Sequence, residues 1–162
     1  MKSLILPILI LFISASCGTK KHNPYLLYKE ETDTQWIKFA RQGRFQKGIE
    51  CLNQKIKDST YRNPHINHLD LSLMFAMKED YSNAIKHRVI AKELIKNPKD
   101  GPWMWHHVGT ISFFRRDKKR LDSIIEFSWQ KEGEFYLVFK QDLISLSENF
   151  YKDYQKATIF QY

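Results

Sequence analysis

The sequence predicts an all-α fold in which antiparallel helix pairs are stacked as a short array. From Tyr25 onward, no convincing run alternates apolar and polar residues with a period of two, whereas apolar residues recur at helical spacing. Turn signals at residues 43–44, 79–80 and 116–117 lie 36 and 37 residues apart, which is typical of repeated helix-turn-helix units. A chain of 162 residues, 43% of them hydrophobic, is long enough for one such array around a single core.

The first helix pair is predicted from two apolar stripes separated by Gly43, which we expect to end a helix. The stripes consist of Trp36, Phe39 and Ala40, and of Phe45, Ile49, Leu52 and Ile56. The second pair follows in the same way from Ile66, Leu69, Leu73 and Met77, and from Tyr81, Ala84, Ile85 and Ile95. It ends at Asn97-Pro98, because proline disfavours continuation of a helix.

The third pair begins at Pro102, since the N–H that proline lacks would have no partner in the first helical turn. Its apolar positions are Trp105, Val108, Ile111 and Phe114, then Leu121, Ile124, Ile125 and Phe127 in a second helix that Gly133 ends. A last helix is predicted over about residues 134–153, with Leu137, Leu143, Ile144 and Phe150 on its apolar side. We expect it to cap the array by covering the apolar edge of the third pair.

Several residue types recur at equivalent positions of the three units. The third unit contains Trp105-x-x-Val108-Gly109 followed by Leu121; the second has Leu71, Phe75, Tyr81 and Ala84; the first has Phe39, Gly43, Phe45 and Gly48. In these residues the chain resembles the tetratricopeptide-repeat family, whose units begin W-x-x-L-G. The resemblance implies three helix-turn-helix repeats over residues 29–131, with a capping helix and tail over 132–162. An unrelated helical bundle is the alternative.

The N-terminus has the three-part layout of a signal peptide: one Lys, an apolar run over residues 4–13, and three small residues. The run is shorter than the roughly 20 residues that a transmembrane helix needs. The string Ser14-Ala15-Ser16-Cys17 resembles a bacterial lipobox, which implies cleavage before Cys17 and attachment of acyl chains such as palmitate to it. We therefore expect a lipoprotein signal peptide over residues 1–16 and the lipidated cysteine with its tether over 17–28. An ordinary signal peptide or an uncleaved anchor are the alternatives.

The residue after this cysteine bears on localisation. By resemblance to lipoprotein sorting rules, Gly18 does not suggest retention in the inner membrane. We therefore expect an exported, membrane-anchored lipoprotein, and we favour the outer membrane over the inner membrane as its location. Without residues 1–16 the chain has a net charge of +7. In the periplasm this excess favours anionic headgroups or acidic protein surfaces over nucleic acid. Cys51 would be the remaining thiol, and we expect it to lie buried on a helix.

The sequence contains no sign of an enzyme or a cofactor. It has no G-x-S-x-G elbow, no H-E-x-x-H string and no Gly-rich phosphate loop. The repeat resemblance instead implies that the first helix of each pair lines a groove that binds a peptide or protein segment. The groove residues that it implies are Arg41, Leu73, Met77, Trp103, His106, Thr110, Phe113 and Phe114. For the last two, packing against the terminal helix is the alternative.

Two further patterns have alternative interpretations. A basic turn, which is either a solvated loop or a contact for anionic headgroups or an acidic partner, consists of Arg115, Arg116, Lys118, Lys119 and Arg120. His65 and His68 lie three residues apart on one helical face, which allows a metal-assisted envelope hydrolase as the alternative function. Our leading hypothesis is a lipid-anchored interaction module of the cell envelope, without a catalytic or metal site, that binds a protein or peptide.

Overall fold

The computed structural model describes residues 35–58, 63–96, 101–128 and 134–160, whose regular structure consists of eight α-helices and no strand. The prediction of an all-α fold is therefore confirmed for this part of the chain. The predicted signal peptide, Cys17 and the tether lie outside the described residues. Among the helices described, none has the length and apolar character needed to cross a membrane.

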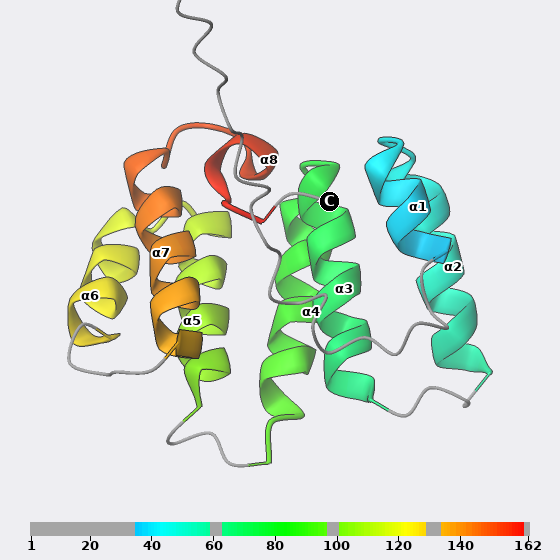
Figure 1. Cartoon of the computed structure of the whole chain (residues 1–162), viewed down its shortest axis with the longest axis horizontal. Coiled ribbons are helices and arrows are strands. Elements are labelled where there is room, and N and C mark those ends of the chain that lie inside the picture. The colour runs from blue at the N-terminus through cyan, green and yellow to red at the C-terminus, as the bar shows by residue number, and fades with distance from the viewer. Residues whose placement is uncertain (1–34, 59–62, 97–100, 129–133, 161–162) are drawn as a thin grey trace, which may run out of the picture.

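Six of the helices form three antiparallel pairs that stand side by side (Figure 1). The pairs are α1 (Gln35–Arg41) with α2 (Phe45–Lys57), α3 (Pro64–Met77) with α4 (Tyr81–Glu93), and α5 (Pro102–Phe114) with α6 (Lys118–Ser128). Helix α2 packs against α3, and α4 packs against α5, so each pair covers an apolar side of its neighbour. This arrangement is the predicted stacked array, while membership of the repeat family stays a prediction.

The turns inside the three pairs share one backbone geometry. Each has one residue in the left-handed region: Gly43 (φ 68°), Glu79 (φ 62°) and Arg116 (φ 57°). The next N–H closes the turn onto the carbonyl five residues back, from Arg44 to Phe39 (2.9 Å), Asp80 to Phe75 (3.0 Å) and Asp117 to Ser112 (2.9 Å). This is the Schellman arrangement, which satisfies carbonyls that the end of a helix leaves free.

The C-terminal part of the chain differs from the single helix predicted over residues 134–153. It forms α7 (Glu134–Glu148) and a short α8 (Tyr154–Ala157). Helix α7 packs against α5 and α6, as a cap should, but α8 returns across the array to contact α3 (Figure 1). The carboxylate of Asp153 accepts a hydrogen bond from the N–H of Lys156 (3.0 Å) and so caps the start of α8.

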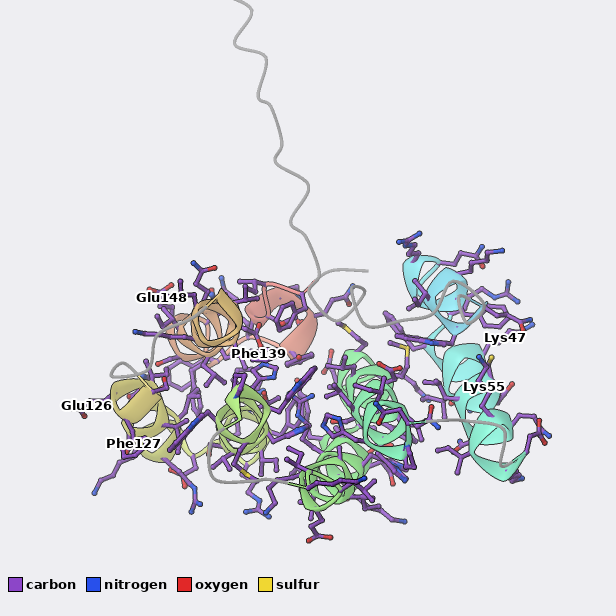
Figure 2. All side chains as sticks on the ribbon, turned by 60° about the horizontal axis from the view of Figure 1, so that its bottom comes forward. Lys47, Lys55, Glu126, Phe127, Phe139 and Glu148 are labelled. Carbon is purple, nitrogen blue, oxygen red and sulfur yellow. The ribbon has the colours of Figure 1, made fainter. Side chains whose placement is uncertain are left out.

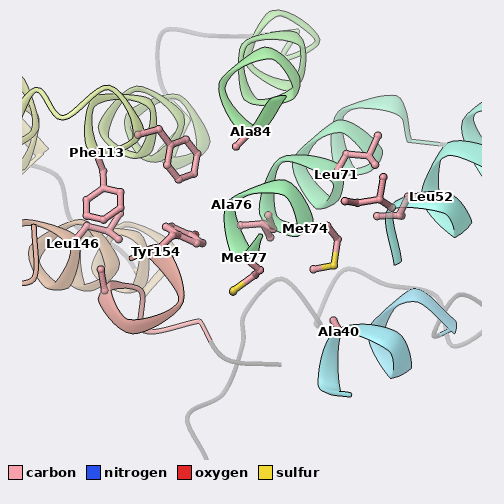
Figure 3. Packing of buried hydrophobic residues seen from close by; sticks show 14 of the residues in the cluster. Ala40, Leu52, Leu71, Met74, Ala76, Met77, Ala84, Phe113, Leu146 and Tyr154 are labelled. Carbon is pink, nitrogen blue, oxygen red and sulfur yellow. The ribbon is translucent and has the colours of Figure 1, made fainter. Parts of the chain in front are cut away.

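Helix α3 lies at the centre of the core because α2, α4 and α8 all pack against it. Leu71 and Met74 of α3 are fully buried, and Figure 3 shows α3 between Leu52 of α2 and Tyr154 of α8. At the other side of the molecule, α5 and α7 approach closely at Gly109. A Cβ atom at this position would lie 2.5 Å from Cδ2 of Leu143, so glycine is needed there for the observed packing.

Candidate functional site

The groove predicted along the third unit is closed in the structure. His106, Thr110 and Phe113 are fully buried and Phe114 is 4% exposed. The ring of Tyr154 in α8 lies 6.1 Å from that of Phe113 and 5.2 Å from that of Phe114, measured between centroids. The expectation of an open groove at these four positions is corrected to a packed interior, because the C-terminal helices fill the space.

The remaining predicted groove residues have different surroundings. Leu73 is fully buried and Met77 is 8% exposed. Trp103 is half-buried, with its ring centroid 4.8 Å from that of Phe139 in α7. Arg41 is exposed at the end of α1. Of these four residues, Arg41 is therefore exposed, Trp103 is partly accessible, and Leu73 and Met77 are buried.

A buried polar chain links α4, α5 and α7. Nη2 of Arg88 donates to Nδ1 of His106 (2.9 Å) and to Oγ1 of Thr110 (3.1 Å), while Nε2 of His106 lies 2.7 Å from Oδ2 of Asp142. Because a guanidinium can only donate, Nδ1 is the acceptor and Nε2 carries the proton that is donated to the carboxylate. Burial and the charge of Arg88 lower the pKa of His106 to about 4, although the bond to Asp142 opposes the shift. The imidazole is thus neutral between a buried cation and a buried anion.

The other carboxylate oxygen of Asp142 holds the C-terminal segment. Oδ1 accepts from Oγ1 of Thr158 (2.6 Å) and from the N–H of Ile159 (3.0 Å). The ring of Phe160, 1% exposed, then packs edge-on against His106 with 5.7 Å between centroids. Residues 158–160 therefore lie on the surface that the repeat resemblance assigns to a ligand, and the buried polar chain is the attachment point.

An open cleft lies beside this closed region, with a volume of about 760 Å³. It lies between the end of α1, the end of α3 and the segment around α8, and its lining comprises Ala40, Arg41, Gly43, Phe45, Met77, Glu79, Lys152, Asp153, Gln155, Lys156 and Phe160. Ala40 and Met77, from two different walls, are both visible in Figure 3. Apolar side chains at the base and both signs of charge around it are suited to a short polypeptide segment, and a cleft of this size holds a few side chains.

The histidines do not form the predicted pair. Nε2 of His65 lies 3.0 Å from Nε2 of His107 in α5, whereas Nδ1 of His68 lies 2.9 Å from Nδ1 of His87 in α4. Burial and then Arg88 lower the pKa of His65 to about 4, and burial lowers that of His68. This arrangement does not favour the alternative of one metal site at His65 and His68, because their rings turn to different helices. In the described ranges, no group of three His, Cys, Asp or Glu side chains could hold a metal ion.

The basic turn is divided between packing and solvent. The guanidinium of Arg116 donates to the carbonyls of Phe150 and Lys152 and lies 5.0 Å from the ring centroid of Phe113. Nζ of Lys118 donates to Asp122 (2.8 Å) and to Ser147 of α7 (3.0 Å). These two side chains tie the turn to α7 and to the residues that follow it. The other three basic residues, Arg115, Lys119 and Arg120, are exposed.

Cys51 also differs from its expected place. Its side chain is half-buried and packs against the edge of the core, where burial raises the pKa of the thiol. It borders a shallow depression on α1 and α2 together with Phe39, Lys47 and Lys55. The expected burial is incomplete because, among the described residues, no further helix covers this side of the first pair.

No model of a known protein family matches the chain, and neither a curated protein nor a solved structure shows significant similarity to it. The structure also brings out two positions that the sequence reasoning missed, Asp142 and Thr158, whose hydrogen bonds hold the C-terminus against α5 and α7. A signal for part of this network was present, because Arg88 occupies a position that is usually aromatic in the repeat family. A lone Asp on an apolar helix face does not reveal its partner.

Proposed function

We propose that the protein is a lipid-anchored interaction module of the bacterial cell envelope that binds a peptide or protein segment. The observation that supports this function best is the cleft between the first helix pair and the segment around α8. It is open, it combines apolar side chains with both signs of charge, and it includes two of the predicted ligand-binding residues, Arg41 and Met77. We propose no catalytic activity.

The cleft favours a ligand that has one apolar side chain flanked by a carboxylate. Met77 and Phe45 offer an apolar contact, and Arg41 is exposed for a charge-assisted hydrogen bond. Lys156 pairs with Asp153 at 2.7 Å, so its charge is already partly compensated. Arg41 is therefore the charged residue whose replacement we expect to weaken binding most.

Site-specific photo-crosslinking in the native membrane tests the proposed binding surface. A photoreactive amino acid at Gln155, which is exposed in the cleft, should capture a protein partner, and Arg41→Glu should abolish the product. The matched control is the same amino acid at Ser82, which is exposed on α4 outside the cleft. Equal products from both positions, or none from Gln155, would argue against a binding site in this cleft.

The proposed anchor has a separate test. In cells, Cys17→Ala should prevent incorporation of labelled palmitate and release the protein from the membrane fraction, because a thioether-linked lipid needs the thiol. Separation of the two membranes then tests the preference for the outer membrane. Palmitate labelling that survives this substitution would exclude Cys17 as the attachment point.

A further inference from the structure

The described charges are unevenly distributed along the array. Residues 35–58 contain six Lys or Arg and two Asp or Glu, a net charge of +4. Residues 134–160 contain three Lys and four Asp or Glu, a net charge of −1. Figure 2 shows Lys47 and Lys55 at one end of the molecule, and Glu126 and Glu148 at the other. The net charge of the described segments is therefore most positive at the first pair and lowest in residues 134–160.

Four basic residues account for most of this positive end. Lys38, Arg41, Arg44 and Lys47 follow one another at intervals of three across α1, the turn and the start of α2, with no acidic residue between them. All four are exposed, and within the described ranges none lies within ion-pair distance of a carboxylate. The acidic residues of the pair, Glu50 and Asp58, come later on α2. We call these four residues the basic patch.

The basic patch lies at the open end of the array. Helix α1 packs against α2, and α2 against α3, but in the described part of the chain nothing packs on the opposite side of this pair. The patch is also close to the proposed attachment point along the chain, since 17 residues separate Cys17 from Gln35. Even fully extended, such a segment spans at most ~60 Å. The first helix pair is thus the described element that directly follows the proposed attachment point along the chain.

We infer that the basic patch docks on an anionic membrane surface and so orients the array with its first pair toward the bilayer. Lipid headgroups with a negative charge attract exposed Lys and Arg side chains, with a gain of roughly fivefold in partitioning for each basic residue near the surface. The cleft that contains Arg41 then opens beside the membrane, and Glu126 of α6 and Glu148 of α7 lie at the other end of the molecule. The inference rests on the proposed anchor only in so far as the anchor brings the basic patch close to the bilayer. The basic patch should bind anionic lipid even when the anchor is absent.

A vesicle flotation assay with the unlipidated chain separates these two ideas. The chain from residue 17 onward with Cys17→Ser retains every described residue and cannot carry an acyl chain. It should float with phosphatidylcholine vesicles that contain phosphatidylglycerol, not with pure phosphatidylcholine vesicles, and added salt should release it. Equal binding to both kinds of vesicle, or to neither, would overturn the inference and leave the proposed anchor and cleft untouched.

Matched variants locate the surface. A variant that combines Lys38→Gln, Arg44→Gln and Lys47→Gln should bind anionic vesicles about a hundredfold more weakly. Arg41 is unchanged in this variant because it also lines the cleft. The comparison variant combines Arg115→Gln, Lys119→Gln and Arg120→Gln at the far turn and should retain most of the binding. A larger loss in the far-turn variant would assign the contact to that turn instead. Because Arg44 lies 5.1 Å from the ring of Phe39, the double variant Lys38→Gln with Lys47→Gln repeats the test with this contact intact.

Discussion

The first helix pair and the third helix pair have the same turn and very different surroundings. Both pairs end their first helix with a left-handed residue and the same closing hydrogen bond. On the third pair, however, α7 and α8 cover α5 and bury a chain of polar groups. On the first pair, Lys38, Arg41, Arg44 and Lys47 are exposed. Equivalent local structure therefore does not decide whether a helix pair offers a binding surface; the elements that pack on it do.

The two regions should also respond differently to loss of charge. In the third pair, removal of one member of the polar chain leaves the others buried without compensation, which costs far more than an exposed pair contributes. In the first pair, water replaces any lost partner.

The largest effect is expected for Asp142→Ala. The substitution removes the acceptor of His106, Thr158 and the N–H of Ile159 and leaves these donors without it. We expect the free energy of unfolding to fall by about 3–5 kcal/mol, measured by urea denaturation. The matched change in the first pair is Glu50→Ala, an exposed carboxylate bound to Gln46, which should cost less than about 0.5 kcal/mol. Similar losses for both variants would contradict the contrast.

Acid should destabilise the third pair and spare the first, which contains no histidine. His106 has a pKa of about 4 in the folded protein and an ordinary value of 6.5. The unfolded chain therefore gains a proton first as the pH falls, and the free energy of unfolding decreases between about pH 6.5 and pH 4. For His106 alone the difference corresponds to about 3 kcal/mol, and the half-buried His65 and His87 act in the same direction.

Urea denaturation across this pH range measures the effect. His106→Gln removes one titrating group and should make the pH dependence shallower, whatever it does to stability at about pH 7. As the pH is lowered, hydrogen exchange should show that α5 and α7 lose protection at a higher pH than α1 and α2 do. An unchanged pH slope in the variant would show that His106 does not resist protonation.

A smaller effect is expected where glycines permit close packing. Gly109→Ala places a methyl group 2.5 Å from Leu143, which is 1% exposed and has little room to move, so we expect a loss of about 1–3 kcal/mol. Gly48→Ala in the first pair meets the flexible Met74 at 3.1 Å and should change stability by less than about 1 kcal/mol, since alanine also favours the helix. Thermal unfolding of both variants provides the comparison, and a greater cost at Gly48 would reverse it.

The helices and turns of the described region were predictable because their signals are local. Apolar residues at helical spacing gave the three pairs. Gly43 marked a helix end because glycine tolerates a positive φ, and Pro102 marked a helix start because proline lacks the N–H that would have no partner there. The end of the last helix was not predictable in this way. Its apolar pattern continues to Phe150, but the helix ends at Glu148 and a separate helix, α8, follows. The position of α8 depends on its contacts with α3 and Tyr81.

The candidate site was predictable only in part. The resemblance pointed to Arg41 and Met77, which border the cleft, but it also pointed to His106 and Phe113, which are buried. The difference arises because a position in a repeat specifies the side of a helix and contains no information on what a distant segment places against that side. Asp142 had no recognisable role in the sequence, because its partners come from two distant parts of the chain, His106 in α5 and residues 158–159 after α8.

By itself, the sequence determined the all-α class, the order of the helix pairs, the position of their turns and the excess of positive charge. These properties depend on neighbouring residues and on composition, and the amino-acid sequence contains both in full. Only the tertiary structure decided that the chain's own C-terminus closes the predicted groove, that the histidines turn to different helices, and that the remaining cleft lies at the first pair. These outcomes depend on which distant side chains meet, because burial and pairing are properties of contacts between segments.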